Sequence, residues 1–231
     1  MRAIIINFTL LLLCMSLWAA DDYRDFTDKA GRVMQAKPVS VIGNQVRIQR
    51  EDGQEFNVST DIFAKADQEF LDEWMLLHLA KNDRLFKIGA KEDGTRKEKT
   101  DREPMTYYNW EGFYKLSIEN KSDLILDDIR VEYRFFVFDD TIAAQKRSEG
   151  QTDKTSGDLK IKLIGPRKTV VVETDKAKMQ ESKLDGGWVF TNSGDRASKD
   201  KLEGIHLKVF KGDLELLDYS EPTSLREKYK W

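Results

Sequence analysis

Hydrophobic and polar residues alternate along most of the chain after residue 20, with the two-residue period that is typical of β-strands. In the first third of the chain, hairpin signals at Gly43-Asn44 and Asp52-Gly53 separate short apolar runs. The pattern therefore predicts a small, closed or nearly closed antiparallel sheet, with strands at residues 22–27, 32–42, 45–51 and 54–58.

After Asp61 the apolar spacing changes to the period of an α-helix. One stripe of three to four turns is formed by Phe70, Leu71, Trp74, Leu77 and His78. We expect this helix to cap the sheet and to complete a first domain at residues 21–81. His78 closes the stripe, and on an apolar helix face it is interpreted as a packed or hydrogen-bonded core residue rather than a ligand.

Residues 91–104 include ten charged residues of both signs and no apolar residue, so this run is predicted to be a long exposed loop. A strand at 84–90 precedes it, which puts the domain boundary near Asn82. Beyond the run, apolar positions alternate within five further strands, at residues 114–118, 129–137, 159–163, 170–172 and 205–209. Seven or eight strands over residues 82–231 predict an antiparallel β-sandwich of the immunoglobulin or fibronectin type III kind. The whole chain is thus expected to be mainly β.

The first twenty residues have the pattern of a secretory signal peptide. Arg2 precedes an apolar stretch, and Ala19-Ala20 offer a cleavage site just before Asp21-Asp22. An uncleaved anchor is the weaker interpretation, because the apolar stretch is shorter than the roughly 20 residues that span a bilayer. We expect an exported protein of the bacterial periplasm, cell envelope or extracellular space, with no membrane association after cleavage.

Composition narrows the chemistry. Of 231 residues, 38 are Lys or Arg and 41 are Asp or Glu, so no broad positive field exists to attract nucleic acid. His78, His206 and Cys14 are the chain's two histidines and single cysteine, which leaves little for a zinc cluster or a nucleophilic triad. We therefore predict no enzyme, no cofactor and no metal site, with a hydrolase as the third and weakest functional class.

Three segments of the first domain occur in a recognisable order: Arg24-x-Phe26-Thr27-Asp28-x-x-Gly31-Arg32, Val46-x-Ile48-x-Arg50-Glu51-Asp52-Gly53 and Ala66-Asp67-Gln68-x-Phe70-Leu71. This succession resembles the SLA1 homology domain 1 family over residues 22–75, with Phe26 where the family commonly has tryptophan. The resemblance implies an SH3-like β-barrel with a C-terminal capping helix that binds protein. In yeast endocytic adaptors, domains of this family recognise an Asn-Pro-Phe-x-Asp peptide; many bacterial relatives are exported proteins in which the domain lies beside unrelated modules.

A peptide groove of this kind needs an apolar floor and a cation for an acidic residue. Phe26 is the candidate floor, and Lys37, Arg47 and Arg50 are the candidate cations, with the two arginines on opposite faces of the third strand. The alternative is that Phe26 belongs to the core and the cations only solvate the surface. The leading hypothesis is an exported, non-catalytic adaptor or structural envelope protein with a protein or peptide partner.

Two further constellations offer alternatives. Aromatic residues crowd around Trp110 and recur at Trp188, which would suit carbohydrate binding if their rings shared an exposed face. The alternative function is therefore a carbohydrate-binding module with a glycan as ligand. Asp139-Asp140, together with Asp153 or Asp158, would suit calcium only if their oxygens converged.

Overall fold

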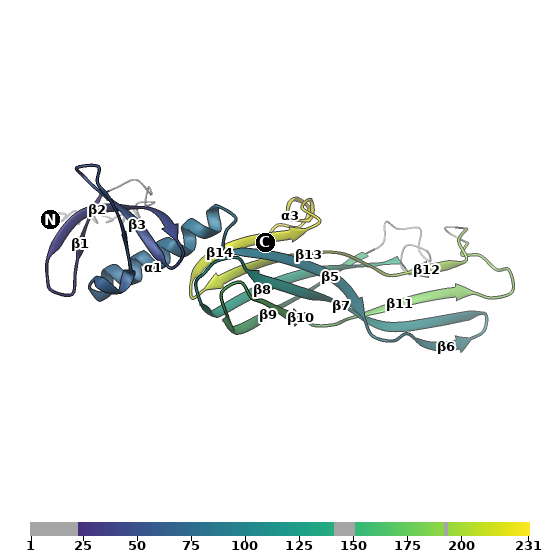
Figure 1. Cartoon of the computed structure of the whole chain (residues 1–231). Coiled ribbons are helices and arrows are strands. Elements are labelled where there is room, and N and C mark those ends of the chain that lie inside the picture. Colours follow the sequence, from purple (N-terminus) through teal and green to yellow (C-terminus); the bar gives the residue numbers. More distant parts are fainter. Residues whose placement is uncertain (1–22, 141–150, 192–193) are drawn as a thin grey trace, which may run out of the picture.

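The computed structural model describes residues 23–140, 151–191 and 194–231, and the signal peptide expected at residues 1–20 lies outside these ranges. The fold is mainly β, as the alternation predicts, and every strand pair is antiparallel. Figure 1 shows an elongated molecule with one small sheet and a helix at one end and two longer sheets at the other. No helix in the described ranges is long and apolar enough to cross a membrane.

The first sheet has the strand order β1-β2-β3-β4, and its strands are β1 (Arg24–Thr27), β2 (Val33–Ile42), β3 (Gln45–Arg50) and β4 (Glu55–Val58). After β4, the short 3-10 helix η1 (Thr60–Ile62) brings the chain back to β1. There the Ala64 N–H donates to the Thr27 carbonyl oxygen at 2.7 Å, and Asp28 forms a β-bridge with Phe63. The returning segment therefore lies along the edge of β1 that β2 does not occupy.

Helix α1 (Lys65–Lys81) packs on the inner face of this sheet. Its buried apolar residues are Leu71, Met75, Leu76 and Leu79, which meet Phe26, Val46 and Ile48 in the core. The buried face of α1 is rotated relative to the predicted apolar stripe, because Trp74 and His78 of that stripe are only partly buried. Their rings stack on each other, with centroids 4.7 Å apart. We call β1–β4, η1 and α1 the N-terminal unit.

The C-terminal unit contains two sheets and a short helix, α3 (Leu225–Lys228). The first sheet has six strands, namely β5 (Phe86–Gly94), β6 (Glu98–Arg102), β7 (Met105–Asn120), β10 (Thr169–Glu173), β11 (Ala177–Leu184) and β12 (Ala197–Lys199). The other has the order β14-β13-β8-β9, from β14 (Leu214–Glu221), β13 (Lys201–Lys211), β8 (Leu126–Asp139) and β9 (Gln151–Ile164).

The long strand β7 organises the six-stranded sheet, because β5 and β6 pair with it along one edge and β10 and β11 along the other. Its inner residues meet the four-stranded sheet in a shared apolar core, where the Tyr114 and Phe135 rings lie 5.8 Å apart. The chain passes from one sheet to the other at Asp200, between β12 and β13. All five strands predicted beyond residue 104 are present.

The structure of the charged run at residues 91–104 differs from the prediction. We expected a loop, but β5 continues to Gly94 and β6 covers Glu98–Arg102, so the described part of this unit has ten strands rather than seven or eight. Pairing with β7 satisfies the backbone of both segments, and the charged side chains form surface ion pairs, such as Lys115 with Asp93 at 2.6 Å. Ladder hydrogen bonds to a long partner strand therefore compensate for the lack of apolar residues.

Candidate functional site

Phe26, the predicted floor of a peptide groove, is fully buried. Its ring lies 5.4 Å from that of Phe63 and 6.1 Å from that of Phe70, so it joins β1 to the segment before α1 and to α1 itself. A ring without exposed surface cannot contact a ligand, and the prediction that Phe26 forms the floor is wrong. The alternative interpretation, that Phe26 belongs to the core, agrees with the structure.

The three predicted cations lie on the same small sheet but have different neighbours. Arg47 points from the outer face of β3 toward β4, where its Nε donates to Asn57 Oδ1 at 3.1 Å and its guanidinium lies 3.7 Å from Glu55. Arg50 ends the strand and pairs with Asp52 at 3.2 Å. Lys37 on β2 lies over the Tyr23 ring, 5.1 Å from its centroid. Among the three cations, Arg47 is therefore the one whose side chain contacts residues of β4.

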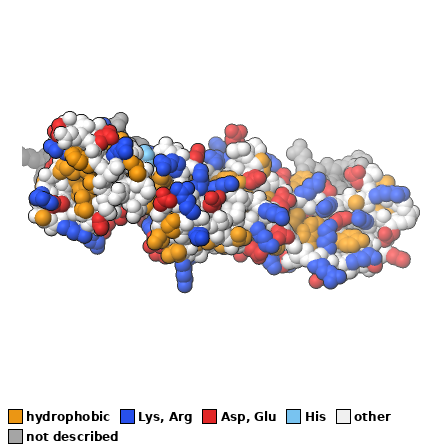
Figure 2. Space-filling model, in the orientation of Figure 1, with side chains coloured by type: hydrophobic (Ala, Val, Ile, Leu, Met, Phe, Trp, Pro, Cys, Tyr) orange, Lys and Arg blue, Asp and Glu red, His pale blue; other side chains and the backbone are white. Residues whose placement is uncertain are grey.

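Strand β4 presents an open edge that the sequence analysis did not identify. In the described part of the chain its ladder partner is β3 alone. Arg50 N donates to Gln54 O at the hairpin, and ladder alternation then directs the backbone N–H and C=O groups of Glu55 and Asn57 outward. Phe56 between them is 40% exposed. Figure 2 shows apolar side chains on the surface of the N-terminal unit beside charges of both signs.

Trp110 and Trp188, the candidate sugar-stacking pair, do not form a common platform. Trp110 is half-buried on β7, with Lys97 Nζ 4.4 Å from its ring centroid. Trp188 is 67% exposed and lies in the turn after β11. Since Leu184 at the end of β11 pairs with Met105, this turn is five residues along β7 from Trp110, roughly 16 Å at the usual rise per residue. Trp110 lines a groove of about 560 Å³ together with Glu92 and Asp200, and Trp188 does not contribute to it.

Of the predicted acidic cluster, Asp158 is distant from Asp139, whereas Asp153 pairs with Val137, two residues along β8 from Asp139. Asp139 pairs with Gln151, whereas Asp158 pairs with Glu132, seven residues along β8 or roughly 23 Å away. Asp140 Oδ2 instead accepts a hydrogen bond from Lys199 N at 2.8 Å.

Asp200 lies nearby, where it accepts hydrogen bonds from Gln180 N at 2.7 Å and from Asp140 N at 3.1 Å. Burial raises its pKa, and the charges of Asp139 and Asp140 raise it further, while the backbone hydrogen bonds partly oppose this effect. These hydrogen bonds give the Asp200 carboxylate a structural role at the point where the chain passes from one sheet to the other.

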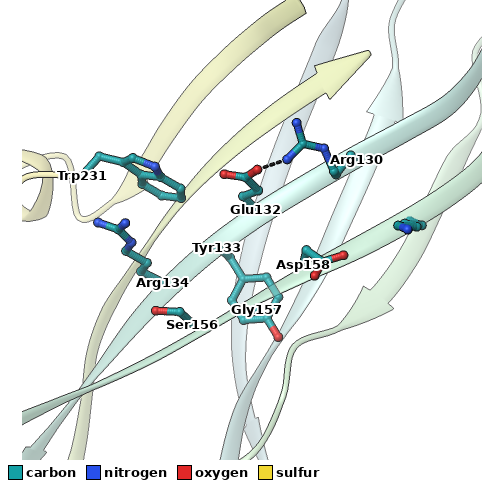
Figure 3. A pocket seen from close by; sticks show the side chains of 9 residues that line it. Arg130, Glu132, Tyr133, Arg134, Ser156, Gly157, Asp158 and Trp231 are labelled. Atoms are coloured by element: carbon teal, nitrogen blue, oxygen red, sulfur yellow. Dashed lines mark ion pairs between the residues drawn. The ribbon is translucent and has the colours of Figure 1, made fainter. Parts of the chain in front are cut away.

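An open groove of about 480 Å³ runs over the outer face of the four-stranded sheet. Figure 3 shows Trp231 on one side, Ser156 and Asp158 on the other, and the ion pair between Arg130 and Glu132 in the floor. The Trp231 ring lies 4.3 Å from the Arg134 guanidinium. Because cations and carboxylates alternate across this face, the groove has no predominant charge.

Tyr133 passes beneath the same groove and under β9. Its hydroxyl accepts a hydrogen bond from Asp175 N at 2.8 Å, so it links β8 to the segment between β10 and β11. Gly157 pairs with Tyr133 across the two strands and lacks the side chain that would occupy this path. The contact is structural, because the phenol oxygen accepts a hydrogen bond from the backbone of the segment between β10 and β11.

Comparisons with known proteins do not assign the chain to a family. No family model and no curated protein matches it. A solved structure described as target SoR45 of the Northeast Structural Genomics Consortium is 10% identical, covers 60% of this chain and 86% of its own, and has a TM-score of 0.29. A crystal structure from Akkermansia muciniphila is also 10% identical, covers 62% and 76% respectively, and has a TM-score of 0.24. Likenesses at these TM-scores bear on neither fold family nor function.

Proposed function

We propose that this chain is an exported, non-catalytic protein-binding protein, an adaptor or structural element of a bacterial envelope. The N-terminal unit is its peptide-binding module. Export rests on the signal-like residues 1–20. The N-terminal unit is interpreted as an SH3-like barrel of the SLA1 homology domain 1 type at residues 21–81, and residues 82–231 as a sandwich of the immunoglobulin or fibronectin type III kind.

Contacts among the motif residues support the proposed kinship of the N-terminal unit. Asp67, from the third motif segment, bonds to Arg24 and Thr27 of the first at 2.7 and 2.8 Å. Gln68 Nε2 donates to the Phe63 carbonyl oxygen at 2.6 Å, where the returning segment meets β1. The motif thus coincides with the residues that attach the helix and bring the sheet toward closure.

The unpaired edge of β4 carries the functional proposal. An open strand edge offers hydrogen-bond partners to an extended peptide, and adjacent side chains then select its residues. Here Phe56 supplies exposed apolar surface, while Arg47 lies next to the edge and is only half-buried. We infer that the ligand is an extended segment of a partner protein that adds to the sheet beside β4.

Selection from a random peptide library on the mature chain, residues 21–231, tests this proposal. Binding of a selected peptide is then compared in Asn57→Pro and Asn57→Ala variants. Proline at residue 57 removes an outward N–H and is tolerated at edge positions, so we expect affinity to fall by at least about tenfold. Alanine retains that N–H and is expected to bind nearly as the parent does.

Two results would contradict the proposal: selection that yields no binding peptide, or an Asn57→Pro variant that binds as tightly as the parent. Circular dichroism of both variants separates loss of binding from loss of fold. The experiment thus isolates one backbone N–H, with the loss of the Asn57 side chain as its matched control.

A carbohydrate-binding function is the second candidate, and the groove beside Trp110 is the observation that favours it. An aromatic ring with carboxylates nearby is suited to stack on a sugar and bind its hydroxyls. A glycan array probed with the parent chain and with Trp110→Ala tests this. Glycan binding that disappears in Trp110→Ala but persists in Asn57→Pro would favour the sandwich over the β4 edge.

A further inference from the structure

A separate cavity of about 240 Å³ lies where the two units meet, which we call the seam cavity. Its lining comes from the β2–β3 hairpin, the end of α1, the β7–β8 turn and the β9–β10 turn, through Val41, Gly43, Leu79, Arg84, Lys121, Ser122, Asp123 and Arg167. Both units therefore contribute to it, whereas no residue of β4 lines it.

The charges around the seam cavity do not balance. Three cations, Arg84, Lys121 and Arg167, line it with a single carboxylate, Asp123. Asp123 pairs with Arg167 at 3.0 Å, and Lys121 Nζ donates to the backbone carbonyl of Asp83 rather than to an acid. In the described part of the chain, Arg84 makes no side-chain hydrogen bond or ion pair. The lining therefore has an excess of two positive charges.

The turns that hold these cations are fixed by a buried residue. Asn120 is fully buried, and its amide nitrogen donates to the carbonyl oxygens of Leu124 and Gly165 at 2.7 and 3.1 Å. Its Oδ1 accepts from both the N–H and the hydroxyl of Ser122. The β7–β8 and β9–β10 turns are consequently joined, and the positions of Lys121 and Arg167 are set relative to each other.

Backbone hydrogen bonds also fix the connection from α1 to β5, which contains Arg84. Arg84 N donates to the Leu79 carbonyl oxygen at 2.8 Å, and Lys121 N donates to that of Leu85 at 2.8 Å. Leu79 and Leu85 are both buried in the same continuous apolar cluster. The short connection from α1 to β5 is thus packed, and Arg84 is presented next to Lys121 by backbone contacts.

We propose that the seam cavity binds a compact oxyanion, the phosphate or sulfate group of a small ligand or of a lipid. A guanidinium and an ammonium group from separate rigid segments provide the charge-assisted donors that such oxygens prefer. The excess of two positive charges matches a dianion. Asp123 already pairs with Arg167, so Arg84 and Lys121 are the principal donors.

Both principal donors lie outside the N-terminal unit, and Val41, Gly43 and Leu79 of that unit complete the wall of the cavity, so the cavity exists only while the two units are packed together. Binding stabilises the arrangement of the units that forms the cavity, since a ligand favours the state that binds it. The site is independent of peptide binding at β4, so the two proposals can succeed or fail separately.

Isothermal titration of the mature chain with sodium phosphate, against sodium chloride at equal ionic strength, is the direct test. We expect saturable binding that weakens by about tenfold or more in Arg84→Gln and in Lys121→Gln, as for loss of a hydrogen bond to a charged group. Lys65→Gln is the matched control, because it removes one cation from α1 whose side chain is 90% exposed.

A second arm identifies the source of the anion. Vesicles of phosphatidylcholine with and without phosphatidic acid are tested for co-sedimentation with the parent chain and the same variants. Binding of orthophosphate, or of the phosphatidic acid vesicles alone, that depends on Arg84 supports the site and identifies its ligand as free or lipid-borne. Absence of saturable binding in both arms, or binding that Arg84→Gln and Lys65→Gln affect equally, would overturn the proposal.

Discussion

Asp67 accepts hydrogen bonds from two groups of the first strand, Arg24 Nη2 at 2.7 Å and Thr27 N at 2.8 Å. The carboxylate is buried and lies in the first turn of α1. Arg24 also covers the Phe70 ring, with its guanidinium carbon 3.9 Å from the ring centroid. One ion pair therefore attaches the helix to β1 and closes one end of the apolar core.

Substitution Asp67→Asn is expected to lower the free energy of unfolding by about 2 kcal/mol, because the amide cannot accept both hydrogen bonds and leaves Arg24 without its charged partner. Urea denaturation followed by circular dichroism measures the change. Asp72→Asn on the exposed side of the same helix is the control and should alter the free energy by less than about 0.5 kcal/mol. Equal effects of the two substitutions would contradict the assigned role.

Gly157→Ala is expected to destabilise the C-terminal unit. A Cβ at this position would lie 2.3 Å from Tyr133 Oη and 2.7 Å from Asp175 Oδ2, so the phenol must give up its hydrogen bond with the Asp175 N–H. Overpacking of this kind typically costs about 1–3 kcal/mol. Thermal denaturation should show a clear decrease in Tm, whereas Gly165→Ala, whose Cβ would be 3.4 Å from its nearest neighbour, should change Tm little.

Three tyrosines should ionise late in alkali, because burial raises the pKa of Tyr114, Tyr133 and Tyr219. Burial is the main cause that raises the pKa of Tyr133 to about 12 and that of Tyr219 to about 12, from an ordinary 10.0. The folded protein therefore retains these protons when the unfolded chain has lost them, and stability falls as pH rises from 10 toward 12. Ultraviolet titration should show the late phenols, and Tyr133→Phe should remove one of them. Titration of every tyrosine near pH 10 in the folded protein would contradict this.

The stability that Asp200 contributes should depend on pH in the opposite direction to that of most carboxylates. Since its pKa is raised above 3.8 by burial and by its acidic neighbours, the folded state binds its proton more tightly than the unfolded state does. Its contribution to stability is present below the ordinary carboxyl pKa and is lost as pH rises through the raised value. The difference in Tm between the parent and Asp200→Asn should therefore change with pH in this window. Asp213→Asn replaces an exposed carboxylate and is the matched control.

The alternation of apolar residues was sufficient to predict a mainly β chain, the four strands of the first sheet and the helix after them. Strand period and hairpin turns are local properties, so Gly43-Asn44 and Asp52-Gly53 specify them without reference to the rest of the chain. The same reasoning failed at residues 91–104. Pairing with β7 compensates there for a composition that predicts a loop, and the partner strand is not visible in a local window.

The sequence by itself determined the type and order of most elements, as well as which residue types were available for binding. Tertiary structure decided their exposure: Phe26 became core, Arg47 was placed beside β4, and Trp110 was separated from Trp188. It also brought Arg84, Lys121 and Arg167 together from segments far apart in the chain. The physical reason is that periodicity depends on neighbours in sequence, whereas burial, edges and cavities depend on which distant segments pack together.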